Sequence, residues 1–189
     1  MNWLLFLSQL PANPSSLRVS IWRKLRAAGA LGLQNGVWML PNQPEQVKFL
    51  EDLLDTVIKQ GASGQIFSIS PLNSDIERDI LMRFHADRGE EYAEFLEQSQ
   101  EFLAEIERET KAQKFTFAEF EESEQDLQRL TSWLEKIRNR DFFAGEKAKQ
   151  AAAVMDQCRT AFEIFSNEVF NRQAPGPDQT PGGLLKAKK

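Results

Sequence analysis

The sequence predicts an α+β protein in which a ferredoxin-like βαββαβ domain is followed by an α-helical hairpin or bundle domain. Three observations lead to this prediction. Short apolar runs alternate with two amphipathic stretches in residues 1–72, in the order strand, helix, strand, strand, helix, strand. Apolar residues recur at helical spacing through residues 73–172. Beyond them the composition shifts to Pro, Gly, Gln and Lys, which predicts a disordered tail over residues 173–189.

The first domain is expected to contain four short strands and two helices. Leu17, Ile21 and Leu25 fall at helical spacing and predict a helix with one buried face. Asn35 and Gly36 predict a hairpin turn between two short apolar runs, because both residue types accept a positive φ. The expected strands cover residues 2–10, 30–33, 37–40 and 65–70, and the expected helices cover residues 17–28 and 45–60.

Helix-capping signals mark where several helices begin. Ser15 or Ser16 is positioned to cap the first helix. Residues 74–77 (Ser-Asp-Ile-Glu) and residues 116–119 (Thr-Phe-Ala-Glu) both match the capping box, in which a Ser or Thr precedes a Glu by three positions. The second domain is therefore expected to hold helices over about residues 74–111, 116–138 and 146–170.

Charge is distributed unevenly along the 189 residues, although the net charge is only −5. Residues 1–44 carry four basic residues and no acidic one, whereas residues 74–140 carry ten basic and 18 acidic residues. The net charge gives no argument for nucleic-acid binding, but a basic front end on an acidic chain favours contact with a polyanion. The acidic run itself is interpreted as a solvated helix face.

The scarcity of cysteine and histidine excludes several kinds of site. Cys158 is the single cysteine and His85 the single histidine. These counts exclude internal disulfides, cysteine-based zinc or iron–sulfur centres and multi-histidine metal sites, so no metal, no cofactor and no enzymatic activity are expected. Cys158 is interpreted as a packed thiol and His85 as a surface or partly packed side chain, because neither has an evident catalytic partner. Apolar runs fall short of the roughly 20 residues that cross a bilayer, which predicts a cytoplasmic protein without membrane contact.

The first predicted helix carries the candidate nucleic-acid site. Arg18, Trp22 and Arg26 lie four residues apart on the face opposite the apolar stripe, and Arg23 and Lys24 flank them. Basic residues beside an aromatic ring suit phosphate contact and base stacking. The alternative is a solvated helix face with Trp22 as a half-buried packing residue. Four cations give modest affinity, so DNA binding would need a homodimer that doubles the contacts.

A second candidate lies on the long helix of the second domain. Arg88 and Tyr92 share one side of that helix, and a guanidinium group beside a phenol could hold a tetrahedral oxyanion. The alternative is an ion pair within the helix, between Arg88 and Glu91, together with Tyr92 packed against the sheet. Single-helix charge pairs are common, and they favour the alternative.

Six segments of the chain carry a family resemblance. They are residues 10–25 (LPANPSSLRVSIWRKL), 36–42 (GVWMLPN), 88–92 (RGEEY), 114–119 (KFTFAE), 133–138 (WLEKIR) and 140–143 (RDFF). In this order they resemble the N-terminal part of the bacterial chromate-resistance regulator ChrB, over roughly residues 2–172. The first domain is also similar to the middle domain of PaaX-type repressors and, more remotely, to Cas2.

The resemblance to ChrB implies a cytoplasmic, DNA-binding transcriptional regulator of chromate efflux genes, with chromate or another oxyanion as a possible effector. A Cas2-type nuclease would need an acidic residue where the first strand ends, and Ser8-Gln9-Leu10 stands there, so metal-dependent hydrolysis is not expected. Full-length members of the ChrB family carry a further C-terminal domain that these residues lack, so the chain is interpreted as a regulator of this type or a truncated relative. The alternative function is an accessory protein-interaction module that docks through its helical half and does not bind DNA.

Overall fold

The computed structural model describes residues 1–11 and 15–173 and confirms the α+β class. The expected tail lies outside the described residues, except that Gln173 still belongs to the last helix. The strands are β1 Trp3–Gln9, β2 Leu31–Gln34, β3 Val37–Pro41 and β4 Ser63–Ile69. The helices are α1 Ser16–Ala27, α2 Pro44–Lys59, α3 Ser74–Lys111, α4 Phe117–Asn139 and α5 Glu146–Gln173.

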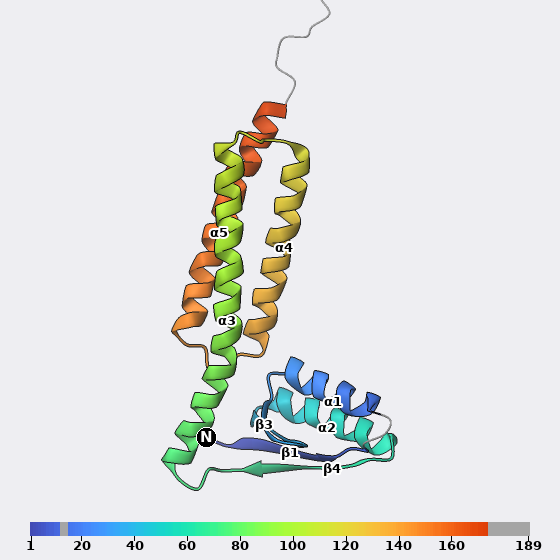
Figure 1. The fold of residues 1–189 in the computed structure, drawn as a ribbon. Helices are drawn as coiled ribbons and strands as arrows, with labels where there is room; N and C mark the ends of the chain where they lie inside the picture. The colour runs from blue at the N-terminus through green and yellow to red at the C-terminus, as the bar shows by residue number, and fades with distance from the viewer. Residues whose placement is uncertain (12–14, 174–189) are drawn as a thin grey trace, which may run out of the picture.

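The four strands form one antiparallel sheet in the order β2-β3-β1-β4, and α1 and α2 cover one of its faces (Figure 1). Leu4 and Phe6 of β1 point to that face and are buried against Ile21 and Leu25 of α1 and Leu50 of α2. Because side chains alternate along a strand, Trp3 and Leu5 point to the opposite face. The βαββαβ order predicted from the sequence is therefore present, with its core between the sheet and the two helices.

Helices α3, α4 and α5 pack side by side as a three-helix bundle (Figure 1). Phe95, Ile137 and Phe165, one from each helix, are buried in its core. The first turns of α3 belong to a different core, because Ile80 and Phe84 cover part of the open face of the sheet. The ring of Phe84 stacks on that of Trp3, with 5.5 Å between centroids. One helix thus takes part in both halves of the protein.

The helix caps follow the predicted capping signals only in part. Thr116 caps α4 as predicted, and its hydroxyl accepts a hydrogen bond from the backbone N–H of Glu119. The predicted cap at Ser74 is wrong by one residue: Asn73 has the extended backbone of a cap, and its side chain accepts from the N–H of Ile76 at 3.0 Å. Ser15 precedes α1, but its backbone is already helical and its side chain makes no capping hydrogen bond.

The two halves meet where α1 ends. Gly29 has a φ of +78°, and a Cβ at this position would lie 2.5 Å from the backbone oxygen of Arg140, in the segment after α4. Only glycine allows both this backbone conformation and this close approach. Within the described part of the chain, no helix combines the length and the apolar character that crossing a membrane requires.

Candidate nucleic-acid interface

Helix α1 presents the predicted cationic face to solvent. Its apolar stripe is buried against the sheet, which turns Arg18, Trp22, Arg23 and Lys24 outward. The side chain of Trp22 is 51% exposed, a large fraction for an indole ring. Phosphate groups and bases could reach every one of these side chains without a change in the fold.

Arg26, the fifth predicted residue, is partly neutralised. Its Nη1 atom lies 3.0 Å from Oδ2 of Asp87 on α3, and its side chain is less exposed than those of its neighbours on α1. A pair as exposed as this one contributes little free energy, and it links α1 to α3. Arg26 therefore belongs partly to the junction between the two halves.

The structure adds two residues that sequence reasoning missed at this site. Arg83 of α3 reaches the edge of the sheet, where its guanidinium donates to the carbonyl oxygen of Gly32 at 3.0 Å. Trp38 of β3 lines the same two hollows as Trp22. Arg83 lies four residues before Asp87, so it shares the side of α3 that faces α1. That spacing is visible in the sequence, but the contact of α3 with α1 is not.

Arg88 and Tyr92, the candidate oxyanion pair, lie together at the junction and are both engaged by other residues. Nη1 of Arg88 lies 3.0 Å from a carboxylate oxygen of Glu91, and the hydroxyl of Tyr92 donates to Asp141 at 3.0 Å. Burial lowers the pKa of Arg88, while burial and the bond to Asp141 raise that of Tyr92. The ion pair within the helix matches the alternative interpretation, but Tyr92 packs in the bundle core and not against the sheet as that interpretation expected.

A charged network extends from this pair across the junction. Arg88 is only 4% exposed and shares Glu91 with Arg140, whose Nη2 lies 2.5 Å from the second carboxylate oxygen. Asp87 stands 3.9 Å from Arg88 and links it to Arg26. A buried guanidinium needs such carboxylates because water cannot stabilise its charge.

Arg88 and Tyr92 border a cavity of about 460 Å³ between α3 and the start of α5. Glu90, Asp141 and Glu146 line the same space, so its walls carry acidic as well as basic groups. Because Glu91 already pairs with Arg88, an anion in this space would compete with that carboxylate for the guanidinium. Among the described residues, no three His, Cys, Asp or Glu side chains form a group that could hold a metal ion.

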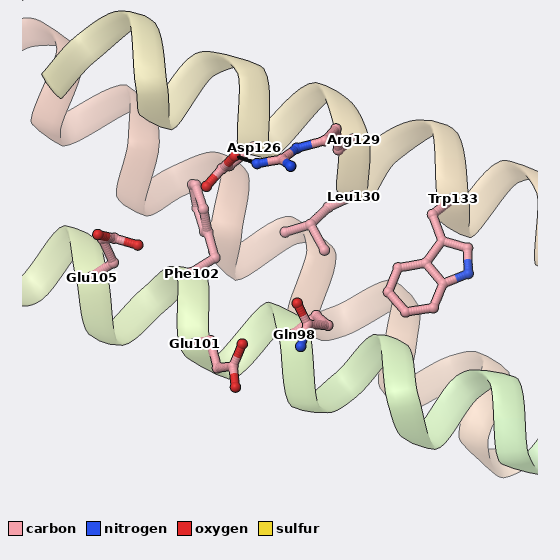
Figure 2. Close-up of a pocket in the computed structure, with 8 residues that line it drawn as sticks. All are labelled: Gln98, Glu101, Phe102, Glu105, Asp126, Arg129, Leu130 and Trp133. Atoms are coloured by element: carbon pink, nitrogen blue, oxygen red, sulfur yellow. Dashed lines mark hydrogen bonds and ion pairs between the residues drawn. The ribbon is translucent and has the colours of Figure 1, made fainter. Parts of the chain in front are cut away.

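The hollow between α3 and α4 has the opposite character to the α1 face. Figure 2 shows Phe102 and Leu130 between the two helices and acidic side chains around them. Glu101, Glu105 and Asp126 line this space of about 340 Å³, and Arg129 pairs with Asp126. Negative charge here repels a polyanion, which leaves the α1 face as the nucleic-acid candidate.

Cys158 is a packed thiol in this structure. It is fully buried, and its sulfur lies 3.7 Å from the backbone oxygen of Ser99. Burial raises the pKa of the Cys158 thiol to about 11. His85 is exposed, and its ring lies beside that of Phe143.

A raised thiol pKa makes stability depend on alkaline pH. The folded protein keeps its proton on Cys158 above the ordinary pKa of 9, where an unfolded thiol has lost it. The free energy of unfolding should therefore fall as the pH rises from about 9 to about 11. Urea titrations across this range should show a shallower fall in the free energy of unfolding for Cys158→Ala than for the original protein. The fall that remains in this variant comes from other groups, such as Tyr92, whose pKa is also raised by burial. An identical pH dependence in both proteins would contradict the role of the thiol.

The sequence of this chain is similar to that of a known protein family. A family model described as the N-terminal part of protein ChrB matches residues 18–175. The chain belongs to the ChrB N-terminal family. Protein ChrB from Cupriavidus metallidurans is 28% identical to it over 167 residues, which cover 86% of this chain and 47% of that relative. The chain thus spans about half the length of the curated relative it matches.

The ChrB N-terminal match covers the residues of the candidate interface. It begins at Arg18 in α1 and continues through α3, so the cations of α1, Trp38 and Arg83 all lie inside it. The charged network of the junction also falls within the match. The family match therefore covers residues in both the α/β half and the helical half of the described fold.

Proposed function

We propose that this chain is the DNA-binding part of a transcriptional regulator of the chromate-resistance type, acting in the cytoplasm as a homodimer and without enzymatic activity. The observation that carries the proposal is the outward cationic face of α1, in a stretch of 44 residues without an acidic side chain. Membership in the ChrB N-terminal family supports it, since the resemblance to ChrB implies such a regulator. Arg18, Arg23 and Lys24 would contact phosphates, and Arg26 would do so while paired with Asp87.

The test is DNA binding followed by fluorescence anisotropy, with a labelled duplex from upstream of the gene and a random duplex beside it. Arg23→Glu with Lys24→Glu should weaken binding by at least tenfold at low salt. The slope of log affinity against log salt should also become shallower, by about 0.9 for each phosphate contact that is lost. Sedimentation of the same samples would show whether the bound form is a dimer.

A matched control changes the same charge elsewhere. Lys149→Glu with Arg159→Glu alters two exposed cations on α5, far along the chain from α1. This variant should bind DNA like the original protein. Equal losses in both variants would mean that net charge alone governs binding, and no binding of either duplex at low salt would reject the proposal.

The effector in this proposal is chromate or another oxyanion, and Arg88 with Tyr92 is its candidate site. Because Glu91 and Asp141 already engage these side chains, effector binding would exchange Glu91 for the anion at Arg88. Such an exchange would also free Arg140 from Glu91 and loosen the junction behind α1. The anisotropy titration repeated with chromate, and with chloride at the same ionic strength as a control, would detect the exchange as weaker DNA binding.

The second candidate function is an accessory protein-interaction module without DNA binding. One observation favours it: Phe117 and Phe170 are about half exposed and lie against each other where α4 begins and α5 ends. Ile164, 61% exposed, lies on the same helix as Phe170. Exposed apolar groups of this kind occur where proteins dock. Failure of DNA binding in the test above would make this function the leading one.

A further inference from the structure

Two neighbouring hollows form one groove beside the edge strand β2. They enclose about 610 and 450 Å³ and share Trp22 of α1, Gly32 of β2 and Trp38 of β3. We call this space the tryptophan groove. It runs between α1 and the β2–β3 hairpin, on the side of the sheet that the two first helices cover.

The lining of the tryptophan groove combines aromatic, cationic and amide groups. Trp22 and Trp38 offer two indole rings, while Arg18 lines the larger hollow and Arg83 the smaller one. Amide side chains that can donate and accept hydrogen bonds line the larger hollow at its hairpin end: Gln9, Gln34 and Asn35. Among the described residues that line this larger hollow, none is acidic, whereas Asp87 lines the smaller hollow and pairs there with Arg26. This is the set of groups that recognises a nucleobase and its phosphate: rings stack, amides bond to base edges, and guanidinium groups bind phosphate.

Gly32 gives the groove its floor. A Cβ at this position would lie 3.4 Å from the six-membered ring of Trp38, in ordinary van der Waals contact, so a side chain larger than a methyl group would extend into the space beside the indole. The guanidinium of Arg83 donates a hydrogen bond to the carbonyl oxygen of the same glycine, at 3.0 Å. Because Gly32 has no side chain, nothing from this residue covers the half-buried ring of Trp38. Trp38 and Trp22 therefore both line the larger hollow.

We propose that the tryptophan groove holds an unstacked nucleobase, so that the chain binds single-stranded or locally opened DNA. The inference rests on the proposed function, since it assigns the nucleic-acid partner of the same α1 face. In a closed duplex the faces of the bases are covered by their neighbours, and an indole ring can reach only their edges. A single strand exposes these faces, and stacking on them tolerates any sequence.

The experiment compares a labelled 15-nucleotide thymidine strand with a duplex of the same length. Phosphate contact alone would favour the duplex, which has the higher charge density. We expect the single strand to bind at least as tightly as the duplex. Trp22→Ala should weaken single-strand binding by about tenfold or more, the value of one stacked base, and should weaken duplex binding by a clearly smaller factor. Gly32→Val should act in the same direction by filling the groove.

A matched control and a folding check accompany these variants. Trp133→Ala removes a partly buried indole from the bundle and should leave both affinities unchanged. A thermal unfolding curve followed by circular dichroism would show whether Gly32→Val still folds. If Gly32→Val does not fold, Trp22→Ala alone provides the test, because the side chain of Trp22 is 51% exposed and lies outside the core.

The outcomes separate this inference from the proposed function. Binding of duplex through Arg23 and Lys24, with Trp22→Ala weakening both DNA forms equally or neither, would overturn the inference and keep the regulator proposal. Single-strand binding that needs Trp22, without duplex binding, would keep the inference and overturn the duplex regulator. Binding of neither DNA would overturn both.

Discussion

Replacing Glu91 with alanine is expected to lower the free energy of unfolding by about 3 kcal/mol, since it leaves a buried cation without its main partner. Arg88 is 4% exposed and Arg140 is about one-fifth exposed, and Glu91 neutralises both. The remaining acid near Arg88 is Asp87 at 3.9 Å, which is already engaged by Arg26. The side chain of Glu91 is about one-fifth exposed, and solvent weakens its interactions to that extent. The expected loss in the free energy of unfolding is therefore at the lower end of the range for buried ion pairs.

Urea denaturation would measure this loss, and two further variants would explain it. Glu91→Gln keeps the shape of the side chain and one acceptor oxygen, so it separates charge from packing. Asp156→Ala breaks an exposed pair with Arg159 on α5 and should change stability by less than about 1 kcal/mol. A loss at Glu91 no larger than that at Asp156 would contradict the description of this network as buried.

The second large effect is expected at Gly29. Gly29→Ala should cost about 3–4 kcal/mol, because it combines a strained backbone with a steric clash. The strain comes from a φ of +78°, which L-residues other than glycine adopt at a cost of about 1–2 kcal/mol. The clash comes from the backbone oxygen of Arg140, which would lie 2.5 Å from the new Cβ and cannot rotate away as a side chain could.

Gly61 provides a matched control for Gly29. Its φ is +74°, but nothing lies within 4 Å of a Cβ built there. Gly61→Ala should therefore cost only the backbone strain, about 1–2 kcal/mol. Thermal unfolding of both variants would isolate the clash as the difference between them. Equal losses in the two variants would show that the segment after α4 moves away from a Cβ at position 29 without lowering the free energy of unfolding.

Much of the fold follows from local sequence. The Asn35-Gly36 hairpin and the cap at Thr116 appear where turn and capping chemistry places them. The first two residues of β4 were not predictable in this way. Ser63 and Gly64 carry no apolar signal, and they are in the strand because they pair with Gln9 and Ser8 of β1. Pairing partners of a strand are a property of the whole sheet.

The candidate site was predictable only where one helix supplies it. The spacing of Arg18, Trp22 and Arg26 places them on one face of α1, and the structure has them there. Trp38 and Arg83 come from other elements and reach the same groove through tertiary packing. Asp141 accepts the hydrogen bond of Tyr92, and Arg140 shares Glu91 with Arg88. Each lies 49 positions after the residue that it contacts, so no helical spacing could reveal these contacts.

Helix α3 gives the protein a mechanical property. It is anchored in the sheet core at one end, at Ile80 and Phe84, and continues as one rod of 38 residues into the bundle. The length from Arg88 to Lys111 is about 35 Å at 1.5 Å per residue. A rotation of about 10° at the charged network would therefore sweep the far end of the bundle through about 6 Å. Small changes of angle beside α1 are thus amplified into large displacements at the opposite end, as by a lever arm.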